Sequence, residues 1–403
     1  MPGNNTITFN PRYAYTNTQQ NSRYEENGAE AIVNGAKDNS HQAVGDIAFV
    51  HSFGKVGTLK VMCQGRFLLN KTRYFGSSSV SDKAQTLRFG PGVNYSYTGE
   101  KLHSTLSIGL NWDRSEYGTT VENTTAPWAD LAVQCSINKK NSFSVRVGYR
   151  KSIPSSGYRS AAVIQSNPLM SYTGNPSLVP YKSFDADGNY TFIINKAFKM
   201  AAYGNVWVVD NRYVYDYQAN DTGVLRTIKQ PLGGFAQWQY GVQGTGKFFK
   251  DNLQVSLSGY MLQGHNGAPY NWNKGRMVVS ASAFYYLKDF YFGATYRGPM
   301  VYPDGCMIGM WMDTRSNYTL QVGWSNDRWN FRFYTRNPFY GNTYATKSTT
   351  QSRYYDSIGR IYTGSYIRFF QISATYTFGY GKKVKAGNEA YKADGASSGI
   401  LNK

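Results

Sequence analysis

The amino-acid sequence predicts an all-β fold, a transmembrane antiparallel β-barrel that occupies residues 1–378. Three observations support this fold class. Aromatic residues make up 16% of the 403 residues, yet the mean hydropathy stays polar at −0.50. Apolar and polar residues alternate along segment after segment, and short and long connections join these segments in turn. Strands that face lipid on one side and water on the other produce this combination.

One hairpin illustrates the alternation. The apolar face of its first strand holds Leu87, Phe89, Pro91, Val93, Tyr95 and Tyr97. After a tight turn at 98–101, the apolar face of the second strand holds Leu102, Leu106, Ile108, Leu110 and Trp112. Small or polar residues fill most of the positions between them, so each strand has one apolar face and one hydrophilic face.

The connections between strands fall into two classes. Short turns lie near Gly54-Lys55, Gly99-Glu100, Lys139-Lys140, Asn195-Lys196, Lys250-Asp251, Lys288-Asp289 and Asn326-Asp327. Longer polar connections are expected at 72–84, 113–125, 154–182, 210–233, 264–274, 298–315 and 337–365. Outer-membrane barrels have tight periplasmic turns and long extracellular loops. Seven hairpins, one strand before them at 7–15 and one after them at 366–378 give about sixteen strands.

A helical membrane protein is excluded by the same sequence. No stretch approaches the roughly 18 uninterrupted apolar residues of a membrane helix. The longest apolar-leaning piece, 277–287, is interrupted by Ser280 and Ser282. In hydrocarbon every backbone N–H and C=O needs a partner, and only helices and closed sheets supply them all. A barrel is the structure that remains.

The final strand and the segment after it have distinct characters. The outward face of this strand holds Phe370, Ile372, Ala374, Tyr376 and Phe378. An amphipathic last strand that ends on an aromatic residue is similar to the signal read by the barrel-assembly machinery. Residues 379–403 are basic and then rich in Gly and Ser, without alternation, so we expect a periplasmic tail.

Two segments resemble a known family. The stretch Tyr172-Thr173-Gly174-Asn175-Pro176-Ser177-Leu178-Val179-Pro180 resembles the GNP-x-L-x-P loop that precedes a barrel strand in TonB-dependent outer-membrane receptors. Residues 374–384 together with 395–401 are similar to the terminus of the outer membrane beta-barrel branch of that family.

The resemblance implies active import. Family members have a barrel of twenty-two strands blocked by an amino-terminal plug, which an energised inner-membrane complex pulls through a TonB box. This sequence has about sixteen strands and no visible plug, TonB box or signal peptide, so we expect Met1 to lie inside a longer natural product. The implied cargo is a scarce nutrient such as a chelated metal, vitamin, glycan or peptide. Two alternatives stay open: a passive porin-like channel of sixteen strands, and a structural or adhesive surface barrel.

The net charge of +19 points to an anionic membrane surface. Nucleic-acid binders gather Lys and Arg on one element, whereas here they are spread along the chain. We therefore expect lipid head groups and lipopolysaccharide, and no nucleic acid, as partners of this charge.

Catalytic and metal-binding chemistry is not expected. The four histidines are scattered singly, and Cys63, Cys135 and Cys306 lack metal-ligand spacing. Asp185, Asp187 and Asn189 imitate a calcium loop, but the sixth position is not Gly and the twelfth is not Glu. The Gly-rich stretch 241–246 leads into a tight turn and no helix follows it to hold phosphate. The sequence predicts no enzyme, no metal and no cofactor.

Ligand contacts are expected from the long loops and the upper lumen. Aromatic plates with amide or guanidinium neighbours suit sugars, peptides or chelates. The candidates are Tyr270, Trp272, Trp311, Phe339, Tyr340, Tyr344 and Arg353. The competing interpretation is that these side chains belong to the interfacial girdle or pack within their own loops.

Overall fold

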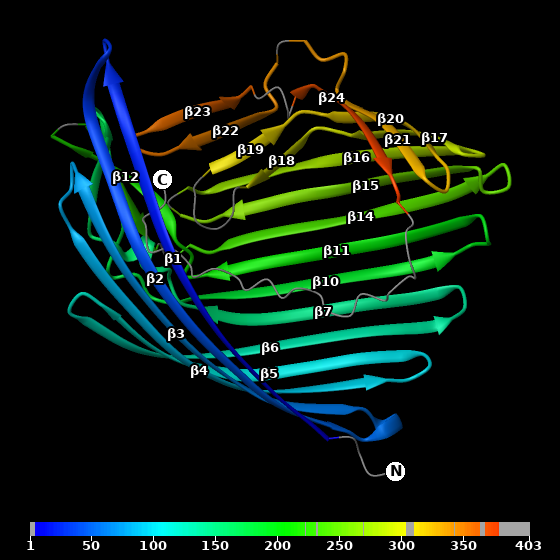
Figure 1. Ribbon diagram of the computed structural model, residues 1–403, viewed down its shortest axis with the longest axis horizontal. Helices are drawn as coiled ribbons and strands as arrows, with labels where there is room; N and C mark the ends of the chain where they lie inside the picture. Colours follow the sequence, from blue (N-terminus) through cyan, green and yellow to red (C-terminus); the bar gives the residue numbers. More distant parts are fainter. Residues whose placement is uncertain are drawn as a thin grey trace.

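The computed structural model describes residues 5–221, 223–230, 233–268, 270–303, 310–341, 343–362 and 367–378. Cys306 and the predicted tail at 379–403 lie outside these residues. Within them, one sheet of sixteen strands is antiparallel throughout and curls as Figure 1 shows, with β1 and β24 as its first and last members. The predicted fold class and strand number are confirmed.

The strands of this sheet shorten along the chain. The first seven are β1 (Asn5–Glu26), β2 (Ala29–Ser52), β3 (Thr58–Gly76), β4 (Ser81–Thr98), β5 (Leu102–Tyr117), β6 (Thr120–Asn138) and β7 (Asn141–Ser152). The other nine are β10 (Tyr181–Ile193), β11 (Phe198–Asp210), β14 (Phe235–Phe248), β15 (Leu253–Asn266), β16 (Trp272–Leu287), β17 (Phe290–Arg297), β20 (Asn317–Ser325), β21 (Trp329–Arg336) and β24 (Phe369–Tyr376).

All seven predicted short turns join neighbouring strands of the sheet. Three of these turns are closed by the same asparagine side-chain hydrogen bonds. The Oδ1 atoms of Asn138, Asn195 and Asn326 each accept hydrogen bonds from two backbone N–H groups that follow, at 2.8–3.0 Å. Asparagine is favoured in turns because its side chain can bond to backbone two residues further on. A short 3-10 helix, η1 (Gly54–Val56), forms the β2–β3 turn.

The first strands are longer than the sequence predicts. The strand expected at 7–15 continues to Glu26, and the connections expected at 72–84 and 113–125 shrink to 77–80 and 118–119. Beyond the membrane both faces of a strand meet polar surroundings, so the apolar–polar alternation stops while backbone pairing continues. A prediction that depends on alternation therefore ends these strands too early.

Four of the other long connections form two additional sheets. In the first, β8 (Val163–Asn167), β9 (Met170–Thr173), β12 (Val214–Asn220) and β13 (Gly223–Lys229) join two connections through a parallel β13–β9 pair. The second additional sheet joins two further connections through an antiparallel β19–β22 pair. Its strands are β18 (Met300–Pro303), β19 (Met310–Thr314), β22 (Thr346–Gln351) and β23 (Asp356–Ile361). The 3-10 helix η2 (Ser156–Arg159) precedes β8.

The outer face of the barrel wall is apolar. Ile108 lies opposite Val93 on one side and Ala129 on the other, and these residues share the outward face. The Ile108 side chain is 49% exposed and Leu106, two residues along, is 45% exposed. A large exposed apolar surface of this kind marks contact with a membrane.

The largest cluster of buried apolar residues lies where the first additional sheet meets the barrel wall. Ala36 on β2 and Tyr74 on β3 pack with Tyr172, Leu178 and Ile228 of the two connections. The first additional sheet is therefore held to the inner face of β2 and β3, and we call it the loop sheet below.

The outward face predicted for the last strand is consistent with its pairing. Ile372 and Ala374 lie opposite Phe333 and Phe331 of β21, and all four are exposed. Recognition of Phe370, Ile372, Ala374, Tyr376 and Phe378 by the assembly machinery stays a prediction.

Candidate functional site

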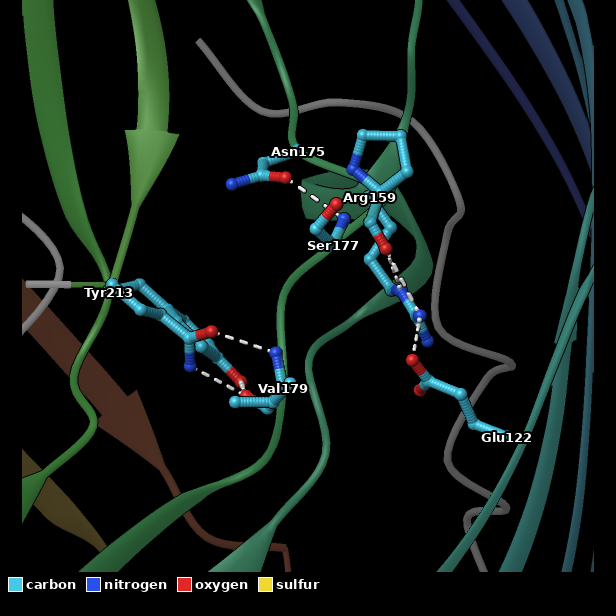
Figure 2. Close-up of polar contacts among 8 residues, drawn as sticks. Glu122, Arg159, Asn175, Ser177, Val179 and Tyr213 are labelled. Carbon is cyan, nitrogen blue, oxygen red and sulfur yellow. Dashed lines mark hydrogen bonds and ion pairs between the residues drawn. The ribbon is translucent and has the colours of Figure 1, made fainter.

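The GNP-x-L-x-P stretch is a tertiary junction (Figure 2). Asn175 Oδ1 accepts a hydrogen bond from Ser177 N at 2.9 Å, which forms a local turn. Its Nδ2 donates to the carbonyl of Ile228, at 2.8 Å, in the second connection of the loop sheet. Leu178 is fully buried. The asparagine and the leucine therefore join one extracellular connection to the next.

Arg159 attaches this junction to the barrel wall. Its guanidinium lies 2.9 Å from the carboxylate of Glu122 on β6 and donates to the carbonyl of Pro176 at 3.1 Å. The Arg159 side chain is only 5% exposed. A buried guanidinium needs such partners, because leaving one unpaired is costly. The sequence motif predicted the junction only in part, since Arg159 and Glu122 lie outside it.

Val179 at the end of the stretch binds the second connection from both sides of its peptide unit. Its N–H donates to Gln230 Oε1 at 2.7 Å, and its carbonyl accepts from Gln230 Nε2 at 2.6 Å. The Tyr213 hydroxyl donates to the same carbonyl at 3.4 Å.

Tyrosines fill the interior of the loop sheet. Burial raises the pKa of Tyr172 and of Tyr217 to about 12, although Arg226 opposes the shift in both. The Arg226 guanidinium lies 5.1 Å from the centre of the Tyr172 ring. Desolvation disfavours the charged phenolate, so both phenols stay neutral at ordinary pH.

On the amino-terminal side of the lumen, arginines are paired with carboxylates. Arg12 lies 2.5 Å from Asp46, Arg88 2.6 Å from Asp113, and Arg146 2.7 Å from Asp130. A cavity of about 880 Å³ on this part of the wall is lined by both signs of charge. Asp46 and Asp130 line it beside several cationic side chains, so carboxylates offset part of its positive charge.

The carboxy-terminal side differs. A cavity of about 650 Å³ lies against β15, β16, β17, β20 and β21, and it is within the size range of small-molecule sites. Three arginines line it: Arg297 at the end of β17, Arg315 just before β20, and Arg336 at the end of β21. Among the described residues that line it, none is Asp or Glu.

None of these three arginines has a carboxylate within 4.0 Å in the part of the chain that the structure describes. The Nε of Arg336 is buried and has no hydrogen-bond partner among the same residues. Serine and threonine hydroxyls supply most of the remaining polar surface: Ser256, Ser258, Ser280, Ser282, Thr295, Thr314, Ser316 and Thr346. We call this cavity with Arg297, Arg315 and Arg336 the arginine pocket.

Two of the predicted ligand-contacting aromatics line the arginine pocket. The Arg315 guanidinium lies 4.5 Å from the centre of the Tyr344 ring. The Tyr340 hydroxyl lies 2.5 Å from Ser316 Oγ, which fixes the loop after β21 beside the segment before β20. Such contacts hold Arg315 over the cavity.

The other predicted candidates lie elsewhere. Trp272 is buried against Val209 and Phe235, and the Tyr270 hydroxyl donates to the carbonyl of Tyr215. Trp311 lies under the ammonium of Lys274, Phe339 is 82% exposed, and Arg353 lies over the Tyr354 ring. Ligand contact by these five residues stays a prediction.

Sequence reasoning missed all three arginines, because its candidates in the loops and the upper lumen were chosen around aromatic residues. Arg315 lies in the predicted connection 298–315, whereas Arg297 and Arg336 lie on strands. Both are at the last positions of their strands, on the polar face: Arg297 lies opposite Ser280, and Arg336 opposite Thr319. Assigning each strand's two faces would have placed them in the lumen. That they converge with Arg315 depends on the register of three strands, which the local pattern does not contain.

The described residues include no helix that is long and apolar enough to cross a membrane. They also contain no group of three or more His, Cys, Asp or Glu side chains arranged to hold a metal ion.

An antiparallel sheet with an apolar outer face, a polar lumen and connections folded inward defines the chain as an outer-membrane β-barrel. The sequence model of the Outer membrane protein beta-barrel family matches residues 128–376, more than half of the chain. The chain belongs to this family, resides in the outer membrane and is not an enzyme.

Solved structures share the fold at low sequence identity. The copper transporter OprC superimposes with a TM-score of 0.67 at 11% identity, covering 92% of this chain and 64% of OprC. The pyoverdine receptor FpvA from Pseudomonas aeruginosa PAO1 gives 0.60 at 11%, covering 93% and 59%. The ferric citrate transporter FecA gives 0.58 at 11%, covering 92% and 59%. The chain thus spans about three fifths of the length of these proteins. No curated sequence matches it.

Proposed function

We propose that this chain is the barrel portion of a TonB-dependent receptor that takes up a scarce nutrient, and that the arginine pocket contacts this nutrient. The observation that carries the proposal is the pocket itself, a ligand-sized cavity in the lumen wall whose described lining has three cationic side chains and no carboxylate. The fold shared with transporters of copper, pyoverdine and ferric citrate supports it.

The charge of the pocket favours an anionic nutrient. Arg297, Arg315 and Arg336 present planar guanidinium groups, which bind carboxylate and phosphate oxygens in pairs. The buried, unbonded Nε of Arg336 gains most from such a ligand, because an unpaired buried donor is costly. A chelated metal with carboxylate groups, an acidic glycan or an acidic peptide has the required chemistry.

The pocket also favours active uptake over a passive pore. A passive channel must bind its solutes weakly, because they have to leave it as readily as they enter. Here the loop sheet is fixed to the inner face of β2 and β3, and a separate cationic cavity lies against the carboxy-terminal strands. These features support capture of a specific ligand.

The proposed partners follow from the same role. The energising inner-membrane complex would act through a plug, and the barrel-assembly machinery would read Phe370 to Phe378. Lipid of the outer membrane would surround the apolar face.

The experiment is uptake in a strain in which the gene is deleted and then restored as wild type, as Arg297→Gln/Arg336→Gln, or as Arg332→Gln. Arg332 is the matched control, since it faces the lumen from the same strand but does not line the pocket. A panel of labelled ferric chelates, glycans and peptides, both anionic and neutral, is offered with and without a protonophore.

We expect saturable, protonophore-sensitive uptake of an anionic compound. The double variant should raise the half-saturating concentration roughly 10- to 100-fold, from loss of charge-assisted hydrogen bonds worth about 1.5–3 kcal/mol. Arg332→Gln should behave as wild type. Uptake that persists with the protonophore, together with steady conductance in planar bilayers, would establish the porin alternative. If the deletion strain takes up every compound as well as the wild type does, the transport proposal fails and the structural or adhesive alternative is supported.

A further inference from the structure

A cluster of four cationic side chains lies on the outer face of the barrel wall, away from the arginine pocket. Lys37 on β2 lies directly opposite Arg73 on β3, and Lys71 on β3 lies directly opposite Lys83 on β4. All four side chains are exposed. We call them the outer cation cluster.

Like charges in directly opposite positions of an antiparallel pair repel, because their Cβ atoms are only about 5 Å apart. None of the four side chains has an acidic partner within 4.0 Å in the described part of the chain. Glu116, on the outward face of β5, is held by Arg114 at 3.1 Å.

The opposite faces of β2 and β3 prevent the cluster from relaxing by a change of register. Asp38, Ser40, Asn70 and Thr72 point inward there and are buried. Thr72 donates to Asp38 Oδ1 at 2.5 Å, and Asn70 donates to Ser40 Oγ at 2.6 Å. A slip of one residue would turn Lys37 inward and Asp38 outward, because alternate side chains face opposite sides.

The cluster lies at the extracellular limit of the apolar band. On β3 the outward positions run from Val61 through Phe67 and Leu69 to Lys71. On β4 they run from Val93 through Leu87 to Lys83. The cations therefore lie where hydrocarbon gives way to head groups, with apolar side chains directly beneath them.

We propose that the outer cation cluster binds the phosphate groups of a phosphorylated glycolipid of the outer leaflet, whose acyl chains lie along Phe67, Leu69 and Leu87. Multivalent phosphate would pair with four cations that have no carboxylate partner among the described residues. The apolar surface below them accounts for a ligand that carries acyl chains. Free phosphate shares the first part of this chemistry and lacks the second. The site is independent of what the lumen transports.

The test uses the full chain folded in a neutral detergent, with bound lipid counted by native mass spectrometry. Bisphosphorylated lipid A, its dephosphorylated form and inorganic phosphate are titrated in separate experiments. Three proteins are compared: wild type, Lys37→Gln/Lys71→Gln/Arg73→Gln/Lys83→Gln, and Lys101→Gln/Lys139→Gln/Lys140→Gln/Lys250→Gln. The last variant loses the same charge from exposed periplasmic turns.

We expect wild type and the turn variant to bind bisphosphorylated lipid A equally. The cluster variant should bind it at least about tenfold more weakly, since each cation near an anionic lipid contributes about a factor of five. Dephosphorylated lipid A should bind weakly to all three, and inorganic phosphate should not compete. Equal binding by the cluster variant, an equal loss in the turn variant, or tight binding of the dephosphorylated lipid to wild type would each overturn the proposal. Full competition by inorganic phosphate would replace the lipid site with a free-anion site.

Discussion

An arginine placed at Ile108 tests which face of the wall meets lipid. Ile108 lies near the middle of β5, with Val93 and Ala129 beside it on the outward face. Arginine on the lipid face of a barrel costs about 2–4 kcal/mol at the bilayer midplane and about 0–1 kcal/mol near the interfaces. For Ile108→Arg we therefore expect a loss of about 2–4 kcal/mol, which is roughly a 30- to 700-fold shift in the folding equilibrium.

Two controls on the same strand separate position from chemistry. Leu102 faces outward at the periplasmic end, so Leu102→Arg should cost about 0–1 kcal/mol. Ser107 faces the lumen, where Asn94 donates to its Oγ at 2.7 Å and Asp130 lies opposite. Ser107→Arg should change the free energy of unfolding by less than about 1 kcal/mol, because an arginine there meets water and a carboxylate.

The assay is urea-dependent folding into lipid vesicles, followed by the heat-modifiable migration of the folded barrel in a gel. The order of cost should be Ile108→Arg, then Leu102→Arg, with Ser107→Arg least. A result in which Ser107→Arg costs as much as Ile108→Arg would refute the assignment of faces, and with it the membrane topology.

Two further predictions concern the loop sheet. Gly174→Ala places a methyl group about 2.5 Å from two backbone carbonyl oxygens of the same connection, so we expect a local loss of about 1–3 kcal/mol. Limited proteolysis within 153–180 should accelerate in this variant. In the control Gly244→Ala the added methyl group meets no atom within 4 Å, so the cleavage pattern should stay that of the wild type. If Gly174→Ala and the wild type are cleaved alike, the crowding at Gly174 is disproved. Tyr172 and Tyr217 have pKa values raised to about 12 by burial. In the unfolded chain both phenols lose their protons from about pH 10, whereas in the folded sheet they keep them until about pH 12. Their contribution to the stability of the sheet is therefore complete below pH 10 and is lost as the pH rises towards 12. Hydrogen exchange of β12 and β13 should accelerate over this range, and should accelerate less in Tyr172→Phe/Tyr217→Phe. Ionisation of both phenols near pH 10 in the folded protein, followed by absorbance at 295 nm, would contradict the raised pKa values.

The membrane-spanning part of the fold could be predicted because its information is local. A lipid-facing strand such as β5 records its orientation in every second residue, from Leu102 to Trp112. A turn such as Asn138–Asn141 records its geometry in one asparagine. Alternation fails above the membrane, where water contacts both faces, and the extended ends of β1, β3 and β5 were missed for this reason.

The candidate site was predictable only in part. Tyr340 and Tyr344 were identified as aromatic loop residues and do line the arginine pocket. Arg297 and Arg336 carry no local signal that distinguishes them from Arg146 or Arg88, which also face the lumen. The difference lies in the neighbouring strand. Arg146 forms an ion pair with Asp130 there, and Arg88 with Asp113. Arg297 and Arg336 lie opposite Ser280 and Thr319, which carry no charge.

The sequence by itself determined the number of barrel strands, the face that each presents to lipid and the chemistry of the short turns. These depend on the side-chain period of two and on residues adjacent in the chain. Only the tertiary structure decided that distant connections pair into the loop sheet, that Arg297, Arg315 and Arg336 share one cavity, and that Lys37, Lys71, Arg73 and Lys83 lie in opposed pairs. Such arrangements follow from strand register, which is fixed by packing between segments far apart in the sequence and leaves no periodic trace in any one of them.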